Sequence, residues 1–141
     1  MLKLNLSDIM CEHPITVKET VSVGEVAHLL FRYRINGILV VEKDDKSKLI
    51  GIFTTTDLLR LIDEALAKGI HREEALKNIS KKLVGDLASK CVVALQKDTK
   101  VSKAVATMHK KNVHTIPVFD KDKLVGVVGR HDILNITFHY Y

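Results

Sequence analysis

The pattern of hydrophobic and polar positions is most informative between residues 49 and 62. Apolar residues on both sides of Gly51 predict a short buried strand, and the leucines that follow Asp57 at helical spacing predict a helix. The turn between them is polar and contains three threonines at positions 54–56. This turn therefore brings hydroxyl groups, a carboxylate and the free N–H groups of a helix start into one small volume.

The same strand–turn–helix pattern occurs again 75 residues later, with Gly126 and Asp132 in the positions of Gly51 and Asp57. Upstream of it, a shift of 78 residues aligns residues 8–41 with the second half of the chain without a gap. The difference between the two offsets falls in a predicted hairpin loop, where insertions are tolerated. The pattern therefore indicates an internal duplication.

Each copy predicts the element order β-α-β-β-α, so the chain is expected to be a mixed α+β or α/β protein. The few strands of one copy cannot cover their own apolar faces, and the two copies are therefore expected to pack against each other. We place the first repeat at residues 1–65 and the second at residues 84–141. Residues 66–83 contain too few Gly, Ser and Pro residues for a flexible tether, and they predict a helical connector.

Composition is that of an ordinary globular protein, with 46% hydrophobic and 28% charged residues. The net charge of +5 is uneven, because residues 1–70 carry 9 Lys/Arg and 10 Asp/Glu, whereas residues 71–141 carry 13 and 7. An anionic partner of the second half, such as a phosphate, is one interpretation, and a solvated lysine surface is the other. No apolar run approaches the ~20 residues that cross a bilayer. The first five residues lack the apolar core of a signal peptide, so we expect a cytoplasmic location.

The sequence contains no signature of catalysis or of a metal site. Cys11 and Cys91 stand alone, without a Cys-x-x-Cys pair, and we interpret them as small apolar residues in a reducing compartment. Phosphate-binding Gly-rich loops, nucleophile elbows and paired histidines on a helix are all absent. The short basic pairs at 81–82 and 110–111 have no interleaved aromatic residues, which argues against nucleic-acid binding. We therefore expect no enzyme, no metal and no cofactor.

The duplicated pattern resembles the tandem cystathionine-β-synthase (CBS) domain pair, or Bateman module, over residues 6 to about 136. The segment 112–118 looks like the start of the family's strand with its usual proline, Pro117, which Leu39 replaces in the first copy. The resemblance implies two repeats packed through their sheets with pseudo-twofold symmetry. It also implies clefts between the repeats that hold AMP, ADP, ATP or S-adenosylmethionine, and a stand-alone module that pairs into a homodimer of four repeats.

The first candidate site centres on Asp57. Its carboxylate could accept hydrogen bonds from both ribose hydroxyls of a nucleoside, with nearby threonines adding hydroxyl groups. The alternative is that Asp57 only caps a helix beginning at Leu58. The candidate set for this site is Ile15, Asn36, Ile52, Thr54, Thr56 and Asp57.

The second candidate site departs from the first, because Gly129 stands where Thr54 stands and removes one hydroxyl. Arg130 and His131 add positive charge that suits a phosphate, although they could equally be solvent-exposed turn residues. The candidate set for this site is Val93, His114, Thr115, Val127, Arg130, His131 and Asp132. The aliphatic members of both sets would line an apolar slot for adenine, or they are plain core residues.

These interpretations predict a regulatory module that binds an adenine nucleotide without turning it over and so influences a regulated protein. Two alternatives remain open at the level of the sequence. One is a ligand-free module that dimerises or assembles proteins, and the other is a nucleic-acid binder that uses the lysine-rich second half.

Overall fold

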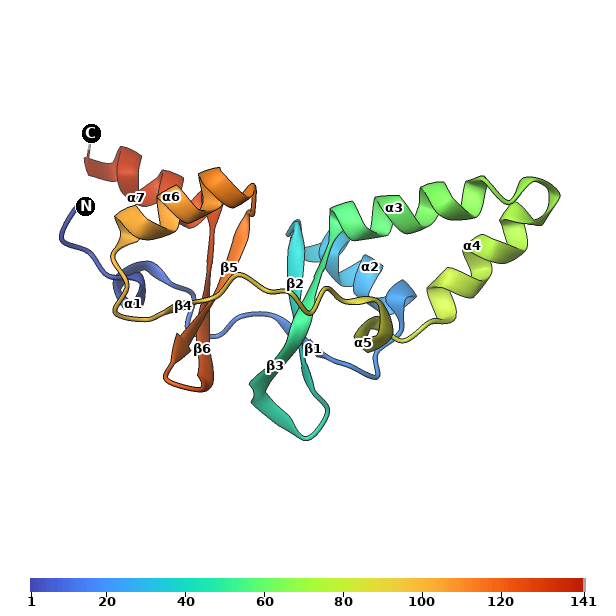
Figure 1. The fold of residues 1–141 in the computed structure, drawn as a ribbon, viewed down its shortest axis with the longest axis horizontal. Coiled ribbons are helices and arrows are strands. Elements are labelled where there is room, and N and C mark those ends of the chain that lie inside the picture. Colours follow the sequence, from blue (N-terminus) through green and yellow to red (C-terminus); the bar gives the residue numbers. More distant parts are fainter. Residues whose placement is uncertain (141) are drawn as a thin grey trace. The chain divides into compact units, whose positions relative to one another are not determined.

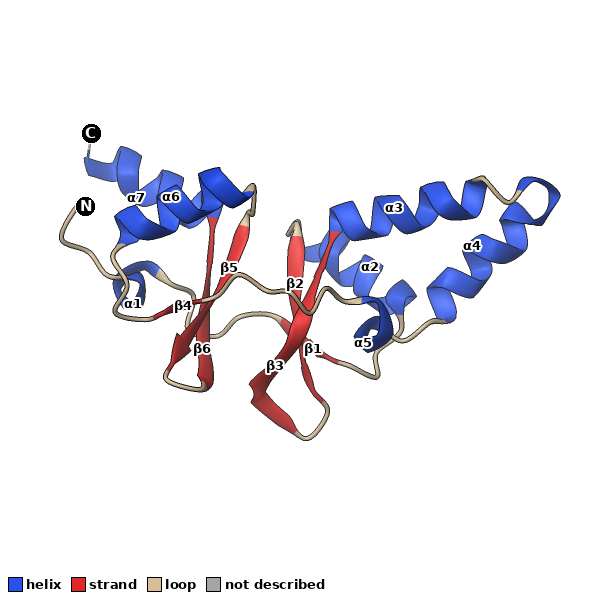
Figure 2. Cartoon of the chain, in the orientation of Figure 1, coloured by secondary structure: helices blue, strands red, loops and turns tan. Residues whose placement is uncertain are grey.

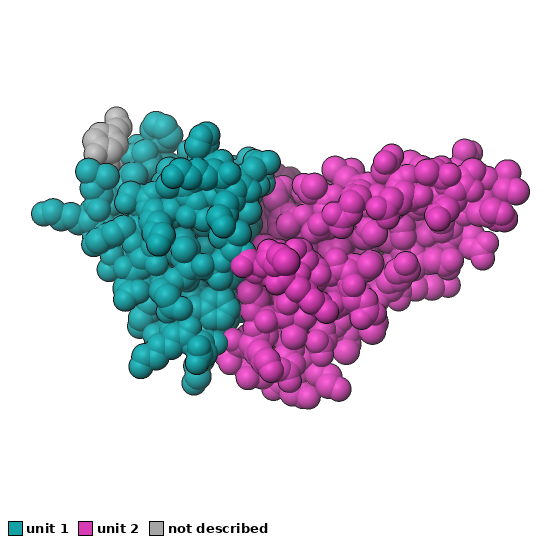
Figure 3. All heavy atoms as spheres, in the orientation of Figure 1, with its two compact units in different colours: residues 1–14, 93–141 teal, residues 15–92 magenta. Residues whose placement is uncertain are grey.

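A computed structural model describes residues 1–140 as two compact units, which Figure 3 shows in different colours. Unit 1 consists of residues 1–14 together with the chain from residue 93 onward, and unit 2 consists of residues 15–92. The chain therefore passes from one unit to the other twice. The compact units do not coincide with the repeats, because the leading segment of each repeat belongs to the unit that contains the sheet of the other repeat.

Unit 2 contains a three-stranded sheet in the order β1-β2-β3, in which β1 runs parallel and β3 antiparallel to β2 (Figure 1). Its elements are β1 (Thr16–Lys18), α2 (Val23–Tyr33), β2 (Gly37–Glu42), β3 (Asp45–Thr54), α3 (Thr55–Leu66), the 3-10 turn η1 (Gly69–His71), α4 (Arg72–Lys81) and α5 (Val84–Leu87). The predicted β-α-β-β-α order of the first repeat and the helical character of the connector both appear in this order of elements.

Unit 1 repeats the same sheet, with strand order β4-β5-β6 and the same parallel and antiparallel pairings (Figure 2). Its elements are α1 (Leu6–Ile9), β4 (Leu95–Gln96), α6 (Val101–Lys111), β5 (Thr115–Asp120), β6 (Lys123–Gly129) and α7 (Arg130–Tyr140). The mixed α/β class with two matching three-stranded sheets is therefore confirmed. No helix within residues 1–140 is both long enough and apolar enough to cross a membrane.

The short helices α1 and α5 supply core residues to the units that contain them. Leu6 of α1 is fully buried among the apolar residues of unit 1, next to Val101 and Ile116. Val84 of α5 holds the equivalent position in the second repeat, and it is fully buried in the core of unit 2 beside residues such as Phe53. Each core is thus completed by a side chain from the other repeat.

The glycine of each duplicated strand allows another segment to cross the strand closely. In unit 2 the backbone of Ser89 exchanges two hydrogen bonds with Ile52, at 3.0 and 2.9 Å. A Cβ atom at Gly51 would lie 2.5 Å from the Ser89 carbonyl oxygen. In unit 1 the backbone of Cys11 bonds to Val127 in the same way, at 2.9 and 3.1 Å. The close approach of these segments explains why the strand carries glycine in both copies.

Candidate ligand-binding sites

All six residues of the first candidate set lie in unit 2, and three of them form the junction of β3 and α3. Thr54 is the N-cap of α3, and its hydroxyl accepts a hydrogen bond of 3.2 Å from the Asp57 N–H. In the opposite direction, Oδ2 of the Asp57 carboxylate accepts a hydrogen bond of 2.9 Å from the Thr54 N–H. The two residues form a capping box. A capping role for Asp57 is therefore present, with differences in detail from the expectation: the cap residue is Thr54, the helix begins at Thr55 rather than Leu58, and Asp57 completes the box.

The carboxylate of Asp57 is largely occupied by its own chain. Besides the Thr54 N–H, its Oδ2 accepts the Thr54 hydroxyl at 2.9 Å. Its Oδ1 lies 3.4 Å from Nη2 of Arg60, and the side chain is 14% exposed. A ligand hydroxyl at this place would compete with Thr54 for Oδ2 or join Arg60 at Oδ1.

The other members of the first set lie around this turn and along the sheet. The carbonyl oxygen of Asn36, just before β2, accepts the Thr55 N–H at 2.8 Å, and both Asn36 and Thr56 are exposed. Ile52 is half-buried in β3. Ile15 is 37% exposed and precedes Thr16, which lies in the same row of the sheet as Ile52. The structure thus brings Asn36 and Thr56 to the junction, while the two isoleucines lie along the sheet.

The second candidate set lies entirely in unit 1, with its polar members at the junction of β6 and α7. Asp132 Oδ2 accepts the Gly129 N–H at 2.7 Å, which is one half of the capping box seen at Asp57. The Arg130 N–H donates to the His114 carbonyl oxygen at 3.0 Å, so His114 holds the place of Asn36. The backbone arrangement of the two junctions is therefore the same.

The side chains of the second junction carry positive charge. Nη1 of Arg130 lies 3.4 Å from Nδ1 of His114, and both residues are exposed, as is His131. None of the ion pairs found within residues 1–140 joins Arg130 to a carboxylate. Arg130 is therefore available to an incoming anion, which its planar guanidinium can contact through two N–H groups.

The remaining members of the second set belong to the strands or precede them. Thr115 opens β5 opposite Gly129, and Val127 of β6 pairs with Pro117. Val93 is half-buried and lies two residues before β4. Their positions match those of Gly37, Ile52 and Ile15 in the first repeat.

The structure adds residues that the sequence did not indicate. A cavity of about 750 Å³ in unit 2 reaches Asn36 and Thr55, and it is also lined by Ala27, Leu30, Phe31, Arg32, Arg34, Ile35, Leu58, Leu59 and Ile62. Arg34 adopts a left-handed conformation, with φ of 52°. The sequence did contain one signal of this cavity. Helices α2 and α3 carry more apolar residues than a single buried face requires.

A smaller cavity in unit 1, of about 330 Å³, is lined by Asp132 together with Asp8, Ile9, Asn135, Ile136 and His139. Asp132 therefore borders open space within its own unit, whereas Asp57 faces Thr54 and Arg60. Within residues 1–140, no three or more His, Cys, Asp or Glu side chains are grouped so that they could hold a metal ion.

Comparison with known proteins agrees with the duplicated architecture. The family model described as "CBS domain" matches two segments of the chain, residues 6–64 and 84–138. A homoserine O-acetyltransferase of Methanohalobium evestigatum is 33% identical over 129 residues, which is 91% of this chain but 23% of that enzyme. The chain thus spans about a quarter of the first curated relatives that it matches.

Two solved structures share the fold over nearly the whole chain. The CBS domain pair of a protein in complex with 5′-methylthioadenosine and S-adenosyl-L-methionine is 27% identical, with a TM-score of 0.76 and coverage of 98% of both chains. The structure of CBSX2 in complex with AMP is 22% identical, with a TM-score of 0.78 and coverage of 96% of this chain and 97% of the other.

Proposed function

This chain belongs to the CBS domain family, and we propose that it is a regulatory module that binds an adenosine-containing ligand without turning it over. The observation that carries the proposal is the duplicated junction, in which Asp57 and Asp132 hold the same backbone position at the first turn of a helix. The solved CBS pairs with AMP or with S-adenosylmethionine support this class of ligand.

The two junctions suit different parts of such a ligand. At the first, Thr54, Thr56 and Asp57 offer hydroxyl and carboxylate oxygens that match a ribose. At the second, Arg130 and His114 offer nitrogen donors that match a phosphate. Under this proposal the half-buried aliphatic residues of both sets lie against adenine. The ligand then favours the conformations that bind it best, and so changes the surface presented to a regulated protein.

We test the proposal by thermal denaturation with AMP, ADP, ATP, S-adenosylmethionine and NADH. A ligand at 100 times its dissociation constant stabilises the folded chain by about 2.7 kcal/mol. We expect Asp132→Ala to remove most of the shift at the second site and Asp57→Ala to remove it at the first. Asp63→Ala, an exposed residue later on α3, is the matched control and should respond like the parent.

Selectivity for phosphate is tested at Arg130. The parent should prefer AMP over adenosine, and Arg130→Ala should reduce that preference by about five- to tenfold in isothermal titration. An unchanged preference would contradict the assignment of phosphate to this junction.

A ligand-free assembly module is the second candidate, and the occupied carboxylate of Asp57 favours it. An unchanged melting temperature with every compound would select this alternative.

The module is also proposed to pair with a second copy. Large apolar side chains are exposed in both units, among them Phe31 at 85% and Leu59 at 66% in unit 2, and Phe138 at 72% in unit 1. Exposed apolar patches on a folded domain mark surfaces that associate. Sedimentation of the parent and of Leu59→Glu should show a dimer in the first case and a monomer in the second.

A further inference from the structure

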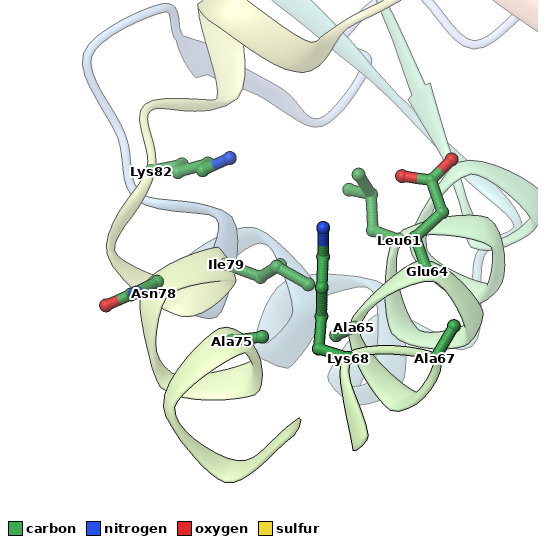
Figure 4. Close-up of a pocket in the computed structure, with 9 residues that line it drawn as sticks. All are labelled: Leu61, Glu64, Ala65, Ala67, Lys68, Ala75, Asn78, Ile79 and Lys82. Carbon is green, nitrogen blue, oxygen red and sulfur yellow. The ribbon is translucent and has the colours of Figure 1, made fainter. Parts of the chain in front are cut away.

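The helices α3 and α4 form a groove that is separate from the two candidate junctions and contains none of their residues. Figure 4 shows this hollow between the second half of α3 and the inner face of α4. Its volume is about 600 Å³. It is lined by Leu61, Glu64, Ala65, Ala67, Lys68, Ala75, Asn78, Ile79 and Lys82. Helix α4 belongs to the connector, which no other segment of the chain repeats.

The walls of the groove are held by contacts elsewhere in unit 2. The Lys82 carbonyl at the end of α4 accepts the Val23 N–H of α2 at 2.8 Å. Helix α4 also approaches α2 closely at Gly24, where a Cβ atom would lie 3.1 Å from the Ser80 carbonyl oxygen. Leu61 of α3 and Ile79 of α4 both pack against the core of unit 2. The separation of the two helices is therefore set by the fold, as in preformed ligand pockets.

The floor of the groove is apolar and contains small side chains. Ala65 and Ala75 lie on the facing helices, and the half-buried Leu61 and Ile79 also line the hollow and pack against the core of unit 2 (Figure 4). Alanine at both facing positions leaves the space that longer side chains would fill. The lining contains no aromatic ring, so the floor suits an aliphatic chain better than a planar base.

Three ionic groups border this floor. In Figure 4 the ammonium of Lys68 reaches into the hollow, that of Lys82 points towards it from the other wall, and the carboxylate of Glu64 lies at one end. None of the ion pairs within residues 1–140 includes any of these three side chains. Two ammoniums and one carboxylate give the groove a charge of +1, which matches a ligand with a single negative charge.

We infer that the α3–α4 groove binds a small aliphatic monocarboxylate. The carboxylate lies between Lys68 and Lys82, and the hydrocarbon lies on the alanines, Leu61 and Ile79. Glu64 repels ligands with several negative charges, and this separates the groove from the proposed nucleotide sites. The inference is independent of the proposed function, because the groove contains none of the residues assigned to the two junctions.

The test titrates the intact chain with butanoate, hexanoate and octanoate, each below its micelle concentration, and follows binding by calorimetry. Each added methylene that is buried should raise the affinity by about fourfold until the groove is filled. Octanol and octylammonium, which have the same chain without the negative charge, should bind more weakly than octanoate. Equal binding of all three, or no gain with chain length, would overturn the inference. Tighter binding of leucine than of hexanoate would overturn the assignment to a monocarboxylate, since leucine brings an ammonium for Glu64.

Variants then locate the binding. Lys68→Gln and Lys82→Gln should each weaken octanoate binding by about two- to fivefold, the range of an exposed ion pair. Ala75→Leu should weaken octanoate binding by occupying the part of the hollow next to Ala65, and its melting curve shows whether the fold is retained. Lys77→Gln is the matched control, because Lys77 lies on α4 outside the lining. An octanoate affinity equal to that of the parent both in Ala75→Leu and in the Lys68→Gln, Lys82→Gln double variant would overturn the inference. The response to AMP is measured in the same variants and should remain that of the parent.

Discussion

The junction of β3 with α3 and the junction of β6 with α7 share a backbone arrangement but differ in their side chains. In both, the first N–H of the helix donates to the carbonyl oxygen just before the neighbouring antiparallel strand, from Thr55 to Asn36 before β2 and from Arg130 to His114 before β5. In both, a carboxylate of the first turn accepts the N–H of the residue before the helix. Both aspartates therefore help to start a helix besides their proposed contact with a ligand, and ligand selectivity has to come from the residues that differ.

The largest expected effects are at Leu6 and Val84, the core residues that each repeat supplies to the unit containing the other repeat's sheet. Leu6→Ala should lower the free energy of unfolding by about 3 kcal/mol, and Val84→Ala by about 2 kcal/mol, because both side chains are fully buried. Hydrogen exchange shows which unit responds. Leu6→Ala should reduce protection in β5 and β6 more than in β2 and β3, although Leu6 precedes the first repeat's own sheet. Greater loss in β2 and β3 would contradict the assignment of Leu6 to unit 1.

Alanine substitutions at Gly51 and Gly126 compare how closely the segments at Ser89 and Cys11 cross the two strands. Gly51→Ala should destabilise the chain by about 2 kcal/mol, because its Cβ would lie 2.5 Å from a backbone oxygen, that of Ser89. Gly126→Ala should cost slightly less, about 1–2 kcal/mol, because the nearest backbone atom, the Cys11 carbonyl oxygen, would lie 2.8 Å away rather than 2.5 Å, and the Met10 sulfur at 2.7 Å can move. Urea unfolding measures both. Gly129→Ala, where the nearest atom would be 3.6 Å away, is the tolerated control.

The capping hydroxyl that the first junction has and the second lacks can be removed from one and added to the other. Thr54→Ala removes the hydroxyl that caps α3 and should cost about 1 kcal/mol. Gly129→Ser supplies the missing hydroxyl to α7 and should add about 0.3–0.5 kcal/mol, since a Cβ atom fits there without a clash. Melting temperatures of the two variants should therefore move in opposite directions. A loss of stability in Gly129→Ser would show that the second junction does not tolerate the first one's chemistry.

The smallest expected difference lies at the ends of α2 and α6. Arg34 and Asn112 hold equivalent left-handed positions, with φ of 52° and 51°. Asparagine adopts this conformation more readily than arginine. Arg34→Gly should therefore add about 0.5 kcal/mol to the free energy of unfolding, while Asn112→Gly should change it little. Equal changes at both positions, measured by urea unfolding, would contradict the comparison.

The elements that could be predicted from the sequence are those that bury a periodic face. Strands β2 and β3 and helices α2 and α3 show such periods, and so do their counterparts in the second repeat. The helices α1 and α5 were missed because four residues make barely one turn, which is too short for a period. The sequence also could not predict that residues 1–14 pack in the unit of the second sheet and residues 84–92 in the unit of the first. The offset of 78 residues between the repeats is the same whichever sheet these segments pack against.

The site was predicted only as a set of neighbouring residues. The Thr-x-x-Asp spacing of Thr54 and Asp57 already contained the signal of a capping box, although it was interpreted with Asp57 itself as the cap. The contact between Arg130 and His114 joins residues 16 positions apart, so it depends on the pairing of β5 with β6. The groove at Ala75 depends on the angle between α3 and α4, which tertiary packing determines.

The two passages of the chain between units have a consequence for how this module can be inherited or engineered. A single repeat is not expected to fold when it is cut out. Its own sheet would lose the core segment that the other repeat supplies, and the other sheet would lose the segment that leaves with it. Recombination, truncation or grafting is therefore expected to succeed only when residues 6–138 move together. Each half of the duplication therefore lacks a core segment that the other half supplies, and neither half is expected to fold alone.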